Sequence, residues 1–171
     1  MMLSGDHSDL IIKVKGEEFR LHKSILVARS AFFESRFKNE VQEITPGTLI
    51  IDDCEPSYFS SLIYYLYTGS AENLCPENVC GLYEVSLTYQ VEQMKSECIQ
   101  FMMSTISIDN FCDYTALALK HDEKELFQKA VELFTHKGKE ITDNVNWKTF
   151  LEKYPAQANE LYEQVLCQRE K

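Results

Sequence analysis

The sequence of 171 residues predicts an α/β fold, in which a small sheet is flanked by short helices and followed by an all-helical extension. Three observations predict this fold class. The first part of the chain has short runs of Leu, Ile and Val bounded by turn-forming residues, as in strands. Apolar residues three and four apart, which are typical of helices, lie between and after these runs. From residue 107 onward only the helical spacing remains.

Three short strands are predicted for the sheet. The run "LIIKV" predicts the first strand, "KGE" a turn and "FRL" the second strand. After His22 the apolar spacing becomes helical, and Ser30 offers a side-chain oxygen to cap the second of two short helices. Pro46-Gly47 then predicts a turn before "TLIID", whose branched residues favour a third strand.

The remainder of the chain is predicted to be helical. "PSYFSSLIYYLYT" begins at Pro56, which suits a first helical turn, and ends before Gly69, which suits a left-handed stop. "CPENVCGLYEVSLTY" and "VEQMKSECIQFMMSTI" each have an apolar stripe. A helix in "DEKELFQKAVELFTHKG" should have a capping box from Asp122 to Glu125 and end at Gly138. Further helices are predicted in "SIDNFCDYTALALKH", "NWKTFLEKY" and "AQANELYEQVL".

Composition argues against several kinds of partner. Of all residues, 44% are hydrophobic and 12% aromatic, which is enough for a folded core. Lys and Arg number 17 against 27 Asp and Glu, a net charge of -10, so nucleic acid and anionic membranes should be repelled. No apolar run approaches the roughly 20 residues of a membrane-spanning helix, and the N-terminus does not resemble a signal peptide. We therefore expect an intracellular protein of the cytoplasm, the nucleus or both, whose cysteines are free thiols.

The sequence predicts no catalytic or metal site. The cluster from Asp52 to Glu55 places acids beside the Cys54 thiol, but it precedes Pro56, so capping of the next helix explains it better than catalysis. The cysteines and histidines lack zinc-ligand spacing, and no glycine-rich phosphate loop is present. We expect no enzyme activity, no cofactor and no bound metal.

A single valine in a polar segment suggests a binding loop. Phe33 and Phe37 share one face of the second short helix, and Val41 then stands alone in "NEVQE". Such a side chain gains little in a monomer but can fill a pocket of a partner, while its polar neighbours form a rim. One exposed valine is also ordinary, so both interpretations stay open at this point.

The order of four segments resembles the BTB (POZ) domain. These segments are "DLIIKV", "FRLHKSILVARSAFF", "IIDDCEPSYF" and "YLYTG", and the resemblance covers about residues 8 to 105. Within this family the sequence is most similar to speckle-type POZ protein and its MATH-BTB relatives. We therefore expect a BTB domain in residues 1–105 and, in residues 106–171, the helical 3-box and partial BACK extension of those relatives. Their substrate-capturing MATH domain would precede Asp9, so either it was removed here or this protein has no such reader.

The resemblance implies a homodimeric adaptor that binds cullin-3 in a ubiquitin ligase complex. "VQE" matches the hydrophobic-x-Glu motif of such adaptors, which makes Val41 the apolar contact and Glu43 the acid. Phe37 would anchor the loop from beneath, and the stretch after "YTGS" would line the same groove with the first helices after Ser107. The cullin-binding residues implied are Phe37, Asn39, Val41, Glu43, Asn73 and Leu74.

The resemblance also implies a dimer interface. Asp9 and Lys23 match an acid and a base near this interface in BTB domains. They would form either a partly buried pair that fixes the register or an exposed ion pair worth about 0 to 1 kcal/mol. Ile25 matches an apolar interface position that Leu3 or Leu10 of the partner would cover, unless Ile25 is ordinary core.

A different class of function stays open. The chain could serve only as an oligomerisation scaffold, for example in a transcriptional regulator or as a competitor that dimerises with related BTB proteins. The 3-box-like extension favours the cullin-3 adaptor, because a pure dimerisation module does not need it. The partners expected are cullin-3, a second copy of the chain, related BTB proteins and unknown substrate proteins.

Overall fold

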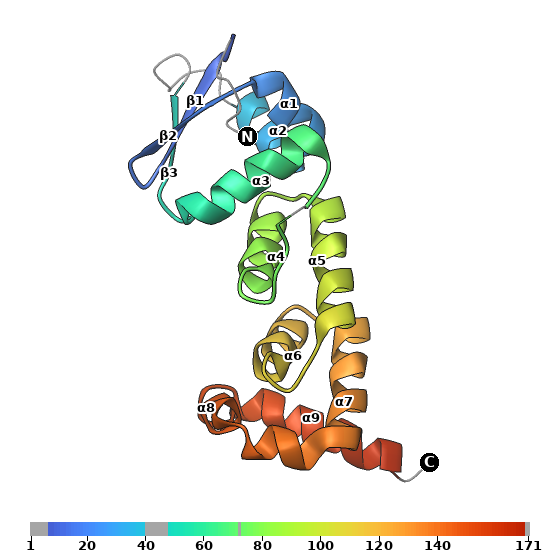
Figure 1. The fold of residues 1–171 in the computed structure, drawn as a ribbon. Coiled ribbons are helices and arrows are strands. Elements are labelled where there is room, and N and C mark those ends of the chain that lie inside the picture. Colours follow the sequence, from blue (N-terminus) through green and yellow to red (C-terminus); the bar gives the residue numbers. More distant parts are fainter. Residues whose placement is uncertain (1–6, 40–47, 72, 170–171) are drawn as a thin grey trace. The chain divides into compact units, whose positions relative to one another are not determined.

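The computed structural model describes residues 7–39, 48–71 and 73–169 (Figure 1). The chain forms two compact units, residues 1–98 and 99–171, and the boundary between them lies within a helix. The first unit contains the strands, and the described part of the second is helical. None of the described helices has the length and the apolar composition needed to cross a membrane.

A small sheet forms one part of the first unit, and its described strands follow the order β2-β1-β3. The strands are β1 (Leu10–Val14), β2 (Glu17–Leu21) and β3 (Thr48–Ile51). β1 pairs antiparallel with β2 and parallel with β3, and Leu10, Ile12 and Val14 are buried on one face. The turn between β1 and β2 has positive φ angles of 46° at Lys15 and 93° at Gly16, a conformation that glycine accepts readily. The three predicted strands are confirmed.

Several helices begin in the first unit, and Figure 1 shows the first three beside the sheet. They are α1 (Lys23–Arg29), α2 (Ala31–Asn39), α3 (Pro56–Thr68), α4 (Val79–Thr88) and α5 (Glu92–Thr105). The hydroxyl of Ser30 accepts a hydrogen bond from the backbone N–H of Phe33 (3.3 Å), so the predicted cap of α2 is confirmed. Gly69 ends α3 with a φ angle of 76°, also as predicted.

Aromatic side chains fill the core beneath α2 and α3. Phe33 is fully buried and stacks on Tyr89, with 5.5 Å between the ring centroids. Phe59 meets the same Tyr89 ring edge-to-face at 5.8 Å. Burial raises the pKa of Tyr89, so its phenol stays neutral at physiological pH. The inner face of α2 therefore rests on a dry aromatic cluster.

The second unit is built from helices around its own aromatic core. They are α6 (Phe111–Lys120), α7 (Lys124–Asp143), α8 (Val145–Lys153) and α9 (Pro155–Arg169). Phe111, Phe134 and Trp147 pack together, with ring centroids 5.4 to 6.3 Å apart, and Phe150 stacks on Trp147. The predicted all-helical extension is confirmed in its element type.

One local prediction about α7 is wrong, and another coincides with a break in the helix. The capping box does not form, because Asp122 has a φ angle of 55° and lies outside the helix, whose first flanking residue, Glu123, makes no side-chain cap. The predicted end at Gly138 lies next to a break: Lys137 has non-helical angles (φ −124°, ψ 23°), and a second helical segment continues to Asp143. Ile141 in this second segment is fully buried, and its burial favours helix beyond the glycine.

Candidate functional site

The start of α1 is fixed by side chains from other segments. Oδ1 of Asp9 accepts a hydrogen bond from the backbone N–H of Lys23 (2.8 Å). The Tyr67 hydroxyl accepts one from the backbone N–H of His22 and lies 2.9 Å from Nδ1 of the same histidine. The carboxylate of Asp9 thus stands at the positive end of the helix dipole. Asp9 and Tyr67 replace the local N-cap, since the side chain of His22 does not cap the helix.

Within one chain, Asp9 contacts the backbone of Lys23 and not its side chain, and a pair at a dimer interface stays a prediction. The carboxylate bonds the backbone of Lys23, and no ion pair joins the two side chains in this described region. The Lys23 ammonium instead lies over the ring of Phe37 on α2, with Nζ 4.7 Å from the ring centroid. The Asp9 carboxylate is engaged by the backbone N–H of Lys23, while the side chain of Lys23 extends to α2, where the face of an aromatic ring attracts the cation.

The other predicted dimer residues differ in their exposure. Ile25 on α1 is half-buried in its own subunit, so part of its side chain is available to a partner. Leu10 is only 5% exposed and belongs to the core behind β1. Its burial leaves Leu10 little surface with which to cover Ile25 of another subunit. Leu3 lies outside the described residues.

Two of the residues predicted to bind cullin-3, Phe37 and Asn39, lie at the end of α2. The half-buried ring of Phe37 stacks on Phe33, with centroids 5.9 Å apart and 15° between the planes. Asn39 is the last residue of α2. Val41 and Glu43 lie outside the described residues. Phe37 therefore connects this end of the helix to the aromatic core on one face and to Lys23 on the other.

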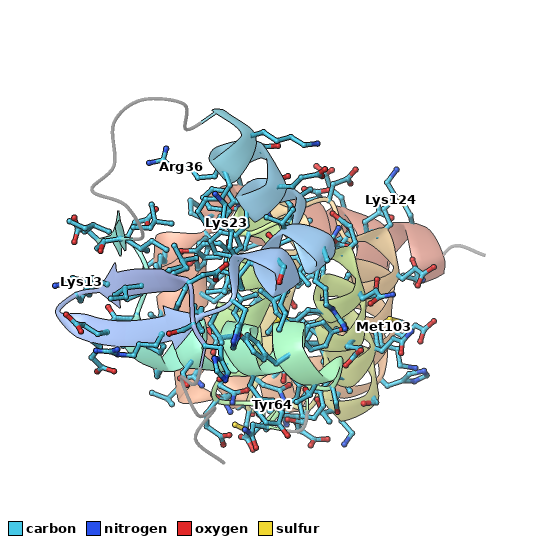
Figure 2. The ribbon with its side chains drawn as sticks, turned by 90° about the horizontal axis from the view of Figure 1, so that it is seen from above. Lys13, Lys23, Arg36, Tyr64, Met103 and Lys124 are labelled. Carbon is cyan, nitrogen blue, oxygen red and sulfur yellow. The ribbon has the colours of Figure 1, made fainter. Side chains whose placement is uncertain are left out.

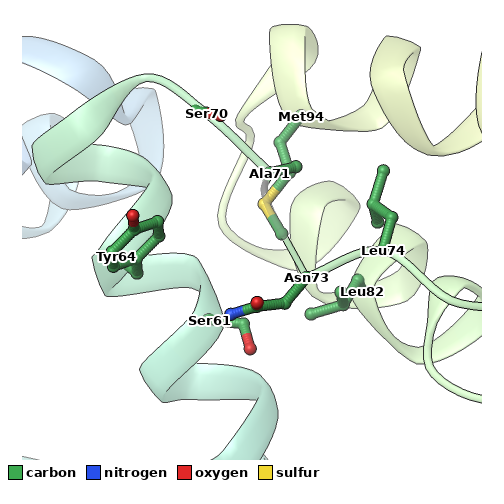
Figure 3. A pocket seen from close by; sticks show the side chains of 8 residues that line it. All are labelled: Ser61, Tyr64, Ser70, Ala71, Asn73, Leu74, Leu82 and Met94. Carbon is green, nitrogen blue, oxygen red and sulfur yellow. The ribbon is translucent and has the colours of Figure 1, made fainter. Parts of the chain in front are cut away.

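A small pocket includes Asn73 and Leu74, the other two residues predicted to bind cullin-3. Its volume of about 10 Å³ is room for roughly one water molecule. Figure 3 shows the Asn73 amide near the hydroxyl of Ser61 and the Met94 side chain on the opposite wall. The pocket is lined by Ser61, Tyr64, Ser70, Ala71, Asn73, Leu74, Leu82 and Met94. This dimple is too small for a drug-sized ligand.

The segment beside this pocket is held by one asparagine. Nδ2 of Asn78 donates to the backbone carbonyl of Asn73 (2.7 Å), and its Oδ1 accepts the backbone N–H of Cys75 (2.9 Å). Leu74, between these contacts, is half-buried. Both Asn73 and Leu74 are therefore fixed in position and partly accessible.

A wider cleft at the junction of α1 and α2 was not predicted. It encloses about 420 Å³, and Ser30, Tyr65 and Val91 lie among its lining residues. The Ser30 hydroxyl donates to the Tyr89 carbonyl (2.6 Å) and so joins this junction to the segment before α5. No sequence pattern indicates the cleft, because its walls come from segments far apart in the chain.

The buried thiols do not form a reactive site. Burial raises the pKa of Cys98 to about 12 and that of Cys112 to about 11. Burial also raises the pKa of Cys54, although a contact with Tyr89 acts in the opposite direction. A thiol is nucleophilic as its thiolate, so these groups are inert near neutral pH. Among the residues described, no three His, Cys, Asp or Glu side chains are grouped to hold a metal ion.

The domain formed by the sheet and its helices matches a known class of interaction domain. A family model described as BTB/POZ domain matches residues 1–106. The chain therefore belongs to the BTB/POZ family, whose domains mediate protein–protein interaction and oligomerisation. The predicted resemblance to this family is confirmed, whereas the specific similarity to speckle-type POZ protein stays a prediction.

Individual relatives agree with this assignment. The chain is 32% identical over 148 residues to a BTB/POZ domain-containing protein of Arabidopsis thaliana, covering 86% of this chain and 60% of that protein. It is 34% identical over 123 residues to Kelch repeat and BTB domain-containing protein 4 of Homo sapiens, covering 72% of this chain and 23% of that protein. The chain thus spans less than two thirds of the length of these curated relatives.

A solved structure supports the fold. The BTB domain of zebrafish PATZ1 matches with a TM-score of 0.52 at 22% identity, over 60% of this chain and 80% of that one. At this identity the match shows the fold alone. The predicted α/β fold of a BTB domain with added helices is confirmed.

Proposed function

We propose that the chain is a homodimeric adaptor that binds cullin-3 in a ubiquitin ligase complex. The observation that carries this proposal is the position of "VQE", which begins two residues after the last residue of α2 in a chain of the BTB/POZ family. Phe37 supports it, because its ring joins the last described turn of α2 to the core. Val41 would be the apolar contact and Glu43 the acid.

The contact would combine a small apolar centre with polar surroundings. Val41 fills a pocket on cullin-3, and Asn39 and Glu43 lie near it in a polar rim. Asn73 and Leu74 extend the surface, since both line the dimple beside α3 and are held by Asn78. In this proposal the adaptor performs no chemistry itself.

Dimerisation would use the exposed part of α1. A two-fold axis presents the same patch from both subunits, so the half-buried Ile25 of each copy can meet its counterpart. Asp9 and Lys23 lie at the start of this helix and would border the contact, and Leu3 would add to it. Two linked subunits would bind two cullin-3 molecules, which raises the effective concentration of the ligase near a bound substrate.

Calorimetric titration with the cullin-3 N-terminal domain tests the proposal. We expect the wild type to bind and the Val41→Ala, Glu43→Lys double variant to lose about 2 kcal/mol or more of binding free energy. The matched control is Ile50→Ala with Glu17→Lys, which changes an exposed apolar residue and an exposed acid on the sheet. The control should bind like the wild type. If the wild type does not bind cullin-3, the alternative function as an oligomerisation scaffold is favoured.

A further inference from the structure

Lys23 and Phe37 touch each other although the sequence places them in different sites. Lys23 matches a dimer-interface position, whereas Phe37 belongs to the predicted cullin-binding residues. In the structure, the ammonium of Lys23 stands 4.7 Å from the centroid of the Phe37 ring. Figure 2 labels Lys23 next to α1 and α2, and Lys13 on the sheet.

The backbone of Lys23 and the ring of Phe37 are each held by a separate contact. The backbone of Lys23 is fixed by Asp9, whose carboxylate bonds its N–H (2.8 Å). The Phe37 ring is fixed from below by its stacking on the fully buried Phe33. Lys23 has no ion pair with a carboxylate of the described residues, so the ring is the partner that the structure gives to its ammonium. A cation at this distance from a ring face is attracted by the ring quadrupole.

We propose that Lys23 is a positioning residue of the cullin-binding surface and acts through the ring of Phe37. Its ammonium holds the Phe37 ring against Phe33 and so fixes the last turns of α2 in the orientation that the partner contacts. The inference rests on the proposed function, because it names cullin-3 as the partner whose affinity depends on Lys23. Asp9 performs a separate task, the capping of α1.

Substitutions at both ends of the contact test this assignment. Lys23→Met keeps the length of the side chain and removes its charge, and Lys23→Arg keeps a cation that stacks on aromatic rings. We expect Lys23→Met to weaken cullin-3 binding by about two- to fivefold, the range that an exposed cation–π contact supports, and Lys23→Arg to restore it. In a Phe37→Leu background, Lys23→Met should cause no further loss. Lys13→Met, the same charge change on the sheet, should bind like the wild type.

The dimer dissociation constant, measured by sedimentation on the same variants, separates the alternatives. We expect Lys23→Met to leave it unchanged. Unchanged cullin-3 affinity with weaker dimerisation would return Lys23 to the dimer interface and overturn the assignment. A loss that Lys23→Arg does not restore would also overturn it. If the wild type binds no cullin-3, the proposed function itself is wrong. If the wild type and Lys23→Met bind cullin-3 equally tightly, the proposed function stands and the role assigned to Lys23 is wrong.

Discussion

The ring of Tyr58 on α3 lies against the Cα atom of Gly81 on α4, so that a Cβ atom at position 81 would be 2.3 Å from Cζ of the tyrosine. Glycine inside a helix costs about 1 kcal/mol relative to alanine, so the contact explains its presence here. In Gly81→Ala the two helices must separate or the Tyr58 ring must move. We expect a loss of about 1 to 2 kcal/mol in the free energy of unfolding, measured in urea.

Two variants define the cause of this loss. Gly138→Ala places its Cβ 3.4 Å from the Phe134 ring, an ordinary contact, so it should not lower stability. Tyr58→Leu should reduce the cost of Gly81→Ala, because the atoms that collide are removed. If Gly81→Ala is more stable than the wild type by about 1 kcal/mol, the difference in helix propensity, the collision with Tyr58 costs nothing.

Asp9→Ala should destabilise the first unit, because the carboxylate is the acceptor for the first N–H of α1. Loss of such a cap costs about 0.5 to 2 kcal/mol, measurable by urea unfolding. The bond goes to the backbone of Lys23, so we expect the losses of Asp9→Ala and Lys23→Met to add. A coupling of more than about 0.5 kcal/mol between them would instead indicate an ion pair between the side chains.

The sequence predicted structural features that depend on neighbouring residues better than features that depend on tertiary packing. "LIIKV", the cap at Ser30 and the stop at Gly69 depend on neighbours in the chain, and all three agree with the structure. Beside Gly138 the helix breaks at Lys137, as the local signal indicated, but the second helical segment, in which Ile141 is buried, was not predicted.

The candidate site depends more on tertiary packing than on local sequence. Sequence resemblance placed Asp9 and Lys23 near each other, which is correct, but it could not decide which atoms meet. The ring of Phe37 reaches Lys23 from another helix, so no spacing rule indicates that contact. Asn78 was missed for the same reason: its two bonds matter only because the chain folds back between Asn73 and Cys75.

Maleimide labelling should separate the cysteines by burial. Cys167 is exposed and should react first in the native protein at pH 7, and Cys167→Ser should remove this fast phase. Cys98 is fully buried with its pKa raised to about 12, so it should react only after unfolding. Mass spectrometry of digested samples assigns each site. Fast labelling of Cys98 in the native protein would contradict the described core.

The raised pKa of Cys98 also has a consequence for stability at high pH. Burial favours the neutral thiol in the folded state, so the unfolded state loses its proton first, near pH 9. The contribution of Cys98 to stability is therefore present below pH 9 and decreases as the pH rises toward 12. In Cys98→Ala this decrease should be smaller, as measured by urea unfolding between pH 8 and 11.

If the chain dimerises as proposed, Ile25→Lys should make it monomeric. The half-buried side chain lies on α1, and a two-fold axis through this face would bring two lysines together in an apolar contact. Multi-angle light scattering across a concentration series gives the molar mass directly. Ser24→Lys is the matched control, because it adds the same charge at an exposed position of the same helix and should remain dimeric. Circular dichroism distinguishes dissociation from unfolding, since a folded monomer keeps its helical signal. An Ile25→Lys protein that dimerises as strongly as the wild type would remove Ile25 from the interface.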